Sequence, residues 1–317
     1  MSAASSVRPV VLVTGAARRI GRAIALDLAA HGHDIALHCH QESAESSATC
    51  EELRALGARA EVLAADLADE AACRALVPAV AQRLGRVDAL VNNASRFSYD
   101  DAASVGPAEM DAHWRVNTAA PVLLARALHE HLAARDASGC VVNLLDQKLA
   151  NPNPDYFSYT LSKAALQSAT VMLAQAFAPR LRVCGVAPGV TLLSGDMSEA
   201  EFERAHRMTP LQRSSTPEDI AAAVRYLLGA RAVTGSTLLV DGQTFGERQG
   251  TARLRVGGAT LKIEVVEWTN SSVKIRLPQL DLDTATSADI EVLKADGTLA
   301  AKSGIELSTQ SNVALAR

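Results

Sequence analysis

Three residues near the middle of the chain have types and a spacing that suit proton transfer. Tyr159 and Lys163 stand four residues apart in YTLSK, which places both on one face of a helix. A phenol has an ordinary pKa near ~10, and a neighbouring ammonium is expected to lower it, which would make Tyr159 a better acid at neutral pH. Asp146 lies upstream, at the end of an apolar run. These three residues therefore predict an acid/base site.

The carboxyl group of Asp146 indicates what kind of substrate such a site would suit. A heterocycle rich in N–H donors, in which a ring nitrogen must gain a proton, is one such substrate. A carboxylate accepts from such donors, and a carboxyl whose pKa is raised by burial also passes on a proton. The alternative is that Asp146 only caps a loop after a strand. The trio favours a nitrogen heterocycle over a simple carbonyl compound.

A glycine loop near the N-terminus predicts a nucleotide site. In VVLVTGAARRIG, Gly15 and Gly21 lie where an apolar run gives way to a helical pattern. Small residues there let the backbone approach a phosphate, and the N–H groups and dipole of a helix N-terminus attract anions. The alternative is a tight turn that needs glycine only for a positive φ. Arg18 and Arg19 add two positive charges to the loop.

The second apolar run decides which dinucleotide is expected. It ends in His38-Cys39-His40-Gln41, where an NAD enzyme places an acid on the ribose diol, so the 2′-phosphate of NADP is favoured. Glu42 follows and opposes that preference. Asp66 is expected to accept from the adenine amino group or, alternatively, to cap a helix. The alternating histidines have no thiolate or carboxylate set to complete a metal site, so none is predicted.

Elements that would position these residues alternate along most of the chain. Strands are expected at 10–15, 34–40, 60–67, 87–94, 140–145, 181–189 and 236–242. Helices are expected at 21–32, 45–57, 70–85, 115–134, 159–178 and 217–229. Apolar strands separated by helices predict an α/β fold with a doubly wound, seven-stranded parallel sheet of the Rossmann type. Its ligands should bind at the carboxyl ends of the strands.

The last part of the chain has a different pattern. From about residue 250, apolar and charged residues alternate, as in LKIEV and VKIRL, which is the period of half-buried antiparallel strands. Asp296-Gly297 is a hairpin signal. We therefore expect an NADP-binding domain at 1–248 and a small all-β module of four or five strands at 249–317, either accessory or fused. About 65 residues is near the lower limit for an independent core.

The composition of the chain indicates which kinds of binding partner are not expected. The 317 residues carry a net charge of -4 and 21% charged residues, which gives no reason to expect nucleic acid. No apolar run approaches the ~20 residues of a membrane helix, so no membrane partner is expected. Five scattered cysteines form no C-x-x-C pair, which favours a reducing, cytoplasmic location.

Taken in order, these motifs resemble the short-chain dehydrogenase/reductase family over residues 8 to 247. The resemblance is carried by TG-x-x-x-R-x-G, Asn92-Asn93-Ala94, Asn117, Tyr159-x-x-x-Lys163 and Pro188-Gly189. Within the family the chain looks most like the pteridine reductase branch, which includes dihydromonapterin- and dihydrofolate-reducing members. Arg19, the sequence NNASRF, the histidines after strand two and the aspartate in place of a serine carry this narrower likeness. One departure is Gln41-Glu42, where the branch often has a basic residue.

The resemblance implies roles for individual residues. The implied catalytic residues are Asp146, Tyr159, Lys163 and Asn117, the last through a water that links Lys163 to solvent. The implied NADPH contacts are Gly15, Arg18, Arg19, Ile20, Gly21, His38, His40, Ser43, Asp66, Leu67, Asn93, Ala94, Tyr159, Lys163, Pro188 and Gly189. The implied substrate contacts are Arg19, Ser95, Phe97, Asp146 and Tyr159, with Phe97 stacked on a pterin. Residues 190–210 are expected to form a mobile substrate lid.

Three functions follow from the sequence. The first is NADPH-dependent reduction of a dihydropteridine by hydride transfer and protonation through Tyr159 and Asp146. The second keeps the fold but reduces a ketone or β-ketoacyl group. The third is a nucleotide-binding scaffold whose β tail recruits a partner. The resemblance also implies a homo-oligomer, a dimer or tetramer, with the homotetramer as the expected form.

Overall fold

The computed structural model describes two compact units of the chain. The described residues are 8–150, 152–193, 198–199 and 215–240, with the strand residues 251–256, 259–268, 273–276, 286–293 and 299–307. One unit extends through Val240, and the other holds every strand from Thr251 onward. The predicted boundary between residues 248 and 249 lies outside the described residues, as does most of the predicted lid.

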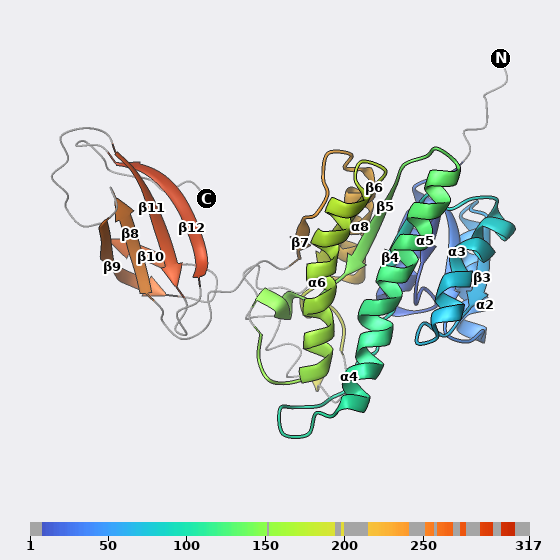
Figure 1. Cartoon of the computed structure of the whole chain (residues 1–317), viewed down its shortest axis with the longest axis horizontal. Coiled ribbons are helices and arrows are strands. Elements are labelled where there is room, and N and C mark those ends of the chain that lie inside the picture. The colour runs from blue at the N-terminus through green and yellow to red at the C-terminus, as the bar shows by residue number, and fades with distance from the viewer. Residues whose placement is uncertain are drawn as a thin grey trace, which may run out of the picture. The chain divides into compact units, whose positions relative to one another are not determined.

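Seven parallel strands form the sheet of the larger unit, as the sequence predicts (Figure 1). Their order is β3-β2-β1-β4-β5-β6-β7, so the direction of winding reverses between β1 and β4. Ligands of doubly wound sheets bind at such a reversal, beyond the carboxyl ends of the strands. The strands are β1 (Val10–Val13), β2 (Asp34–Cys39), β3 (Ala60–Ala64), β4 (Ala89–Asn92), β5 (Gly139–Leu144), β6 (Leu181–Ala187) and β7 (Thr237–Leu239).

Helices cover both faces of this sheet. They are α1 (Arg19–Ala30), α2 (Ala44–Ala55), α3 (Glu70–Leu84), α4 (Pro107–Trp114), α5 (Ala120–Ala134), α6 (Phe157–Phe177) and α8 (Pro217–Gly229). Val11 and Val13 of β1 pack with α1, α2 and α8, whereas Val10 and Leu12 pack with α3, α5 and α6. Figure 1 shows α6, α5 and α3 side by side on one face. Burial on both faces explains why the strands are apolar at every position.

Two features of the helices differ from the prediction. α4 was not predicted, because its eight residues PAEMDAHW show little apolar periodicity. The helix expected at 115–134 begins with a π-helical turn, Arg115–Ala119, before α5 continues it. Such turns are rare insertions into α-helices and often lie at functional sites. This one carries Asn117, which is buried.

The smaller unit is a five-stranded antiparallel sheet, which confirms the all-β expectation. Its order is β10-β9-β8-β11-β12, and its strands are β8 (Thr251–Val256), β9 (Ala259–Trp268), β10 (Val273–Arg276), β11 (Thr286–Leu293) and β12 (Leu299–Leu307). Ala252, Leu254, Ile263, Ala288 and Ile290 are buried on it. The Asp296-Gly297 turn lies outside the described residues, but β11 and β12, which flank it, pair antiparallel.

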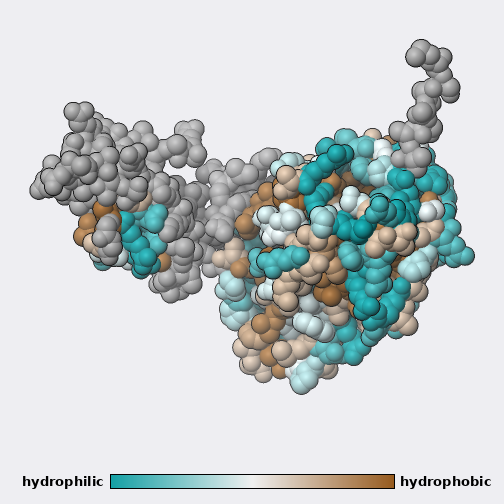
Figure 2. Space-filling view, turned by 45° about the horizontal axis from the view of Figure 1, so that its top comes forward, coloured by the Kyte–Doolittle hydropathy of each residue, from teal (hydrophilic) through white to brown (hydrophobic). Residues whose placement is uncertain are grey.

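The surface of the larger unit mixes hydrophilic and apolar areas on the face shown in Figure 2. Several large apolar side chains of this unit are exposed, including Met110, Trp114, Leu161 and Met172. Among the described residues, no helix combines the length and the apolar character needed to span a bilayer. The five cysteines are free and buried.

Candidate active site

Hydrogen bonds join the glycine loop after β1 to the Asn-Asn-Ala segment that ends β4. The Thr14 hydroxyl accepts from the backbone N–H groups of Asn93 and Ala94, each at 3.0 Å, and donates to the carbonyl of Val91 at 3.3 Å. The Asn93 amide donates to the carbonyls of Thr14 and Gly15 at 2.9 and 3.1 Å. Two segments far apart in the sequence therefore form one rigid edge where the winding reverses.

The glycines of this loop are required by close packing. Gly15 has a φ of +64°, and a Cβ on Gly21 would lie 2.2 Å from the Gly15 carbonyl oxygen. α1 thus begins directly against the loop. No described side chain caps its first turn, and that turn contains no acidic residue. Its N–H groups are left for an anion, so the loop fits the pyrophosphate of a dinucleotide.

Arg19 and the Pro188-Gly189 segment bring the end of β6 to the same edge. Arg19 has a φ of +53°, and its Nη2 donates to the carbonyl of Leu193 at 2.9 Å. The Pro188 carbonyl accepts from the N–H of Gln147 at 2.9 Å, next to Asp146. The loop after β6 is therefore linked both to the glycine loop and to the segment that carries the predicted carboxyl group.

The structure places His38 behind the glycine loop. Its ring is buried; Nδ1 accepts from the N–H of Gly15 at 3.2 Å, and Nε2 lies 3.0 Å from the carbonyl of Ala65. Burial lowers its pKa to about 4, so the ring is neutral at pH 7. His38 thus supports the glycine loop through both ring nitrogens, and its contact with the cofactor stays a prediction.

The other residues after β2 and β3 lie closer to the surface. His40 is exposed, with Nδ1 3.6 Å from Oδ1 of Asp66, so the ends of the two strands are paired. Ser43 caps α2 through the N–H of Ser46 at 3.3 Å. Asp69, not Asp66, caps α3, which excludes the alternative interpretation of Asp66 as that cap. Leu67 is buried. Arg18 and Ile20 lie at the start of α1.

Tyr159 and Asp146 are in direct contact. The phenol donates to Oδ2 of Asp146 at 2.7 Å, and Oδ1 of the same carboxylate accepts from the N–H of Lys148 at 2.8 Å. Asp146 follows β5, and Tyr159 lies in the first turn of α6 with only 7% of its surface exposed. The carboxyl group therefore faces the phenol, as the spacing predicts.

The expectation that the pKa of Tyr159 is lowered is wrong. Burial, together with the charge and the hydrogen bond of Asp146, raises the pKa of Tyr159 well above its ordinary value. Nζ of Lys163 lies 5.8 Å from the centroid of the Tyr159 ring, whereas the carboxylate touches the hydroxyl. Tyr159 is thus a protonated donor at neutral pH.

Lys163 is buried and lies on the same helix as Tyr159. Its Nζ donates to the carbonyl of Leu144 at 2.8 Å, which places the ammonium at the end of β5. Burial lowers its pKa to about 8, with Asp146 acting in the opposite direction. Because that value still exceeds 7, Lys163 remains mostly charged at neutral pH.

Asn117 connects the site to the loop after β4. Its Oδ1 accepts from the N–H of Arg96 at 2.8 Å and from the Ser95 hydroxyl at 3.2 Å. Its Nδ2 donates to the carbonyl of Arg96 and to the hydroxyl of Ser162, each at 3.0 Å. The side chain therefore holds the loop against α6, and the predicted water relay through Asn117 stays a prediction.

Aromatic rings surround the phenol. Phe97 packs edge-to-face on Tyr159, with centroids 4.8 Å apart and an interplanar angle of 89°. It also stacks on Tyr156, with centroids 4.3 Å apart and an angle of 15°. Phe97 is 42% exposed, so part of its ring remains open to a ligand. The predicted stacking residue lies beside the predicted acid.

Two further residues belong to this group, Tyr156 and Lys148, and sequence reasoning did not single out Lys148. Tyr156 has a φ of +51°, and Nζ of Lys148 lies 5.7 Å from its ring centroid. The Lys148 ammonium also donates to the carbonyl of Asp155. The only sequence signal was proximity, since Lys148 stands two residues after Asp146. Within the described residues, no group of His, Cys, Asp and Glu side chains is arranged to hold a metal ion.

Comparison with known proteins adds to this geometry. A family model described as enoyl-(acyl carrier protein) reductase matches residues 15–242. The structure of FolM alternative dihydrofolate reductase 1 from Brucella canis, complexed with NADP, superimposes with a TM-score of 0.71 at 42% identity, over 76% of this chain and 95% of that one. Pteridine reductase 1 of Leishmania tarentolae is 33% identical over 75% of this chain and 96% of its own length. A granaticin polyketide synthase putative ketoacyl reductase 2 from Streptomyces violaceoruber is 34% identical over 74% and 95%.

Proposed function

The chain belongs to the short-chain dehydrogenase/reductase family and is an oxidoreductase, and from this premise we propose that it reduces a dihydropteridine-type substrate with NADPH. The observation that carries the proposal is the 2.7 Å hydrogen bond from the Tyr159 hydroxyl to Asp146. A phenol paired with a carboxylate offers both a proton donor and an acceptor for ring N–H groups. The pterin- and folate-reducing relatives support the same substrate class.

Tyr159, Asp146 and Lys163 have separate roles in the proposed proton transfer. The bound dinucleotide would supply the hydride. Tyr159, protonated at neutral pH, donates its proton to the ring nitrogen as that nitrogen gains electrons. Asp146 accepts from N–H groups of the ring and orients it. Lys163, charged at neutral pH, stabilises the phenolate that remains until solvent returns the proton.

NADPH is the proposed form of the cofactor. The uncapped start of α1 fits the pyrophosphate, and Arg18 and Arg19 bring positive charge to the same loop. No acid occupies the last positions of β2, where a ribose diol would be bound. Ser43, at the N-terminus of α2, lies where an anion is favoured. The Brucella structure, solved with NADP, is consistent with this preference.

A substrate panel tests the function directly. We expect the purified chain to oxidise NADPH in the presence of dihydrobiopterin, dihydromonapterin or dihydrofolate, followed by absorbance at the nicotinamide band. A β-ketoacyl thioester and a simple ketone are the comparison substrates. Turnover of the thioester alone would replace the proposal with the second function, and no turnover of any substrate would favour a non-catalytic scaffold.

The second function has one specific observation in its favour. The Streptomyces ketoacyl reductase is as similar to this chain as the Leishmania pteridine reductase is, at 34% and 33% identity. Overall similarity therefore does not separate the two substrate classes. The carboxyl group at position 146, which touches the phenol, favours the nitrogen heterocycle.

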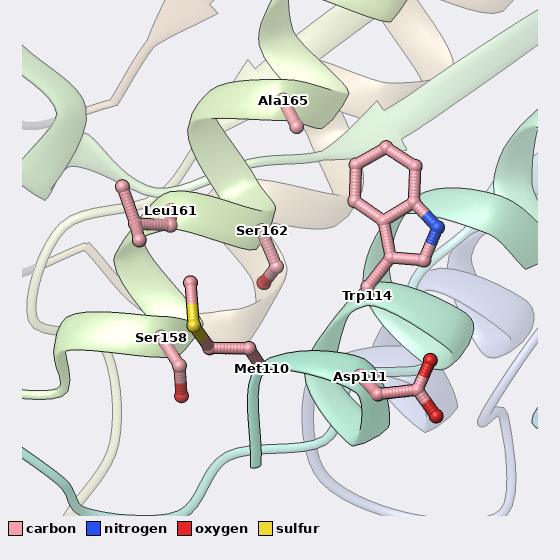
Figure 3. Close-up of a pocket in the computed structure, with 7 residues that line it drawn as sticks. All are labelled: Met110, Asp111, Trp114, Ser158, Leu161, Ser162 and Ala165. Atoms are coloured by element: carbon pink, nitrogen blue, oxygen red, sulfur yellow. The ribbon is translucent and has the colours of Figure 1, made fainter. Parts of the chain in front are cut away.

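We also propose that the chain forms a homo-oligomer, as a dimer or tetramer, through the surface of α4 and α6. Met110, Trp114 and Leu161 expose apolar side chains around a pocket of about 350 Å³ (Figure 3). Burial of such side chains against a second copy would be favourable. Light scattering on the full chain, and on a version ending at residue 246, should give a multiple of one chain's mass in both cases. A monomer would contradict the proposal, and a monomer only in the shorter version would assign association to residues 247–317.

A further inference from the structure

His113 is a buried titratable residue that neither the proposed proton transfer nor the dinucleotide site uses. It lies on α4, none of its surface is exposed, and no sequence motif singles it out. Its ring centroid is 6.2 Å from that of Tyr159, with an interplanar angle of 71°. The role of this buried imidazole, so close to the catalytic phenol, depends on the partners of its two ring nitrogens.

Each ring nitrogen holds a different segment of the site. Nδ1 is 2.7 Å from the hydroxyl of Ser158, the residue before Tyr159 on α6. Nε2 accepts from the N–H of Ser98 at 3.4 Å and lies 3.2 Å from the Ser98 hydroxyl. Ser98 follows Phe97 in the loop after β4. One imidazole therefore connects the neighbour of the phenol to the neighbour of the stacking ring.

These contacts fix the tautomer of His113. A backbone N–H only donates, so Nε2, which accepts from Ser98, carries no proton. Nδ1 then carries the hydrogen and faces two oxygens, the Ser158 hydroxyl and the Glu109 carbonyl at 3.1 Å. Burial lowers the pKa of His113, which keeps the ring in this neutral form at pH 7.

A second contact holds the same loop to the same helix. Oδ1 of Asp100 accepts from the N–H of Ser158 at 3.0 Å, and its backbone carbonyl accepts from the N–H of Phe157 at 3.1 Å. Asp100 thus satisfies donors at the start of α6 from outside the helix. Because Asp100 and His113 both contact Ser158, they hold the loop after β4 rigidly against the start of α6.

We propose that His113 is a positioning residue that sets the edge-to-face contact between Phe97 and Tyr159, and with it the placement of a flat substrate against the proton donor. The inference rests on the proposed function, in which Phe97 stacks on the substrate ring and Tyr159 protonates it. A proton donor displaced by a fraction of an ångström loses much of its effect, so a group that never touches the substrate influences both binding and rate.

Two variants at this position distinguish the effect of losing the hydrogen bonds of His113 from the effect of changing its side-chain volume. In His113→Leu the volume is roughly kept and both hydrogen bonds are lost, whereas in His113→Gln the side-chain amide reaches toward Ser98. For His113→Leu we expect the KM for dihydrobiopterin to rise and kcat to fall by about tenfold each, as for the loss of a buried hydrogen bond. His113→Gln should recover most of the KM effect. NADPH affinity, measured by fluorescence titration, should stay within about twofold, since the glycine loop is not touched.

His131→Gln is the matched control. His131 lies on α5, and its Nε2 also accepts a backbone N–H, that of Val87, at 3.1 Å, but at the opposite end of β4. Its variant should leave KM and kcat unchanged. An equal loss in His113→Leu and His131→Gln, or equal losses for NADPH and pterin in His113→Leu, would mean that His113 serves general stability only and would overturn the proposal.

Two further measurements keep the test decisive. If His113→Leu does not fold, Ser98→Ala removes one partner from the loop side and should raise the KM for dihydrobiopterin without changing NADPH affinity; an unchanged KM rejects the proposal. If the wild-type chain reduces no pterin, the proposed function fails on its own. Amide hydrogen exchange at Ser98 then decides the positioning: it should be about tenfold faster in His113→Leu than in wild type, His113→Gln or His131→Gln, and equal rates reject it.

Discussion

Replacement of Asp146 by serine is expected to lower kcat/KM for dihydropteridines by about 10²-fold, the size of effect typical for loss of a hydrogen bond to a charged group. The carboxylate accepts from the Tyr159 hydroxyl at 2.7 Å, and serine is too short and uncharged to accept from ring N–H groups in the same way. Steady-state NADPH oxidation with dihydrobiopterin measures the loss.

The same variant should not lose activity toward a carbonyl compound. A hydroxyl at position 146 suffices to hold a carbonyl oxygen, so any turnover of a ketone or β-ketoacyl thioester should persist or increase. Asp155→Ser is the matched control, because Asp155 is an exposed aspartate on the same loop. Full pterin activity in Asp146→Ser would show that the carboxyl group is dispensable and would leave a general carbonyl reductase as the better description.

Replacement of Tyr159 by phenylalanine is expected to lower kcat by about 10²–10⁴-fold, the usual contribution of a positioned acid or base. The change removes one hydroxyl from a ring that is otherwise packed against Phe97, so the fold and the aromatic contacts should be retained. NADPH affinity should change little, since the glycine loop and α1 are not altered. Single-turnover measurements of NADPH oxidation would place the loss in the reduction step itself.

Tyr226→Phe controls for the chemical change alone. Tyr226 lies on α8 and is exposed, away from the carboxyl ends of the strands. Its variant should behave as wild type. A Tyr159→Phe protein that retains more than about a tenth of wild-type kcat would require another proton source, because general acid catalysis rarely contributes so little.

Much of the fold could be predicted, because local patterns determine it. Strands such as Val10–Val13 are apolar at every position, which only a sheet covered on both faces explains, and the glycine loop after β1 marks where the winding reverses. The spacing of Tyr159 and Lys163 on α6 correctly placed both side chains near the end of β5. The alternation after residue 250 was enough to predict an antiparallel sheet.

What could not be predicted depends on three-dimensional packing. His38 and His40 alternate in sequence, but only the structure shows that one ring is buried behind the glycine loop and the other is exposed. The direction of the Tyr159 pKa shift depends on burial and on a carboxylate thirteen residues away, and those effects outweigh a lysine four residues away. His113 carries no sequence signal, since its partners come from a loop and a helix distant in the chain.

The stack of Tyr156 on Phe97 has a consequence for ligand selection. Any planar molecule that approaches Phe97 from that side must first displace the tyrosine ring, so its net gain is the difference between two stacking energies, each of only about 0.5–1.5 kcal/mol. An acyclic thioester brings no π surface to the exchange and would have to displace Tyr156 without that compensation. Tyr156 therefore competes with ligands for the face of Phe97. A planar aromatic ligand can replace the stacking energy that is lost, and a flexible acyl chain cannot.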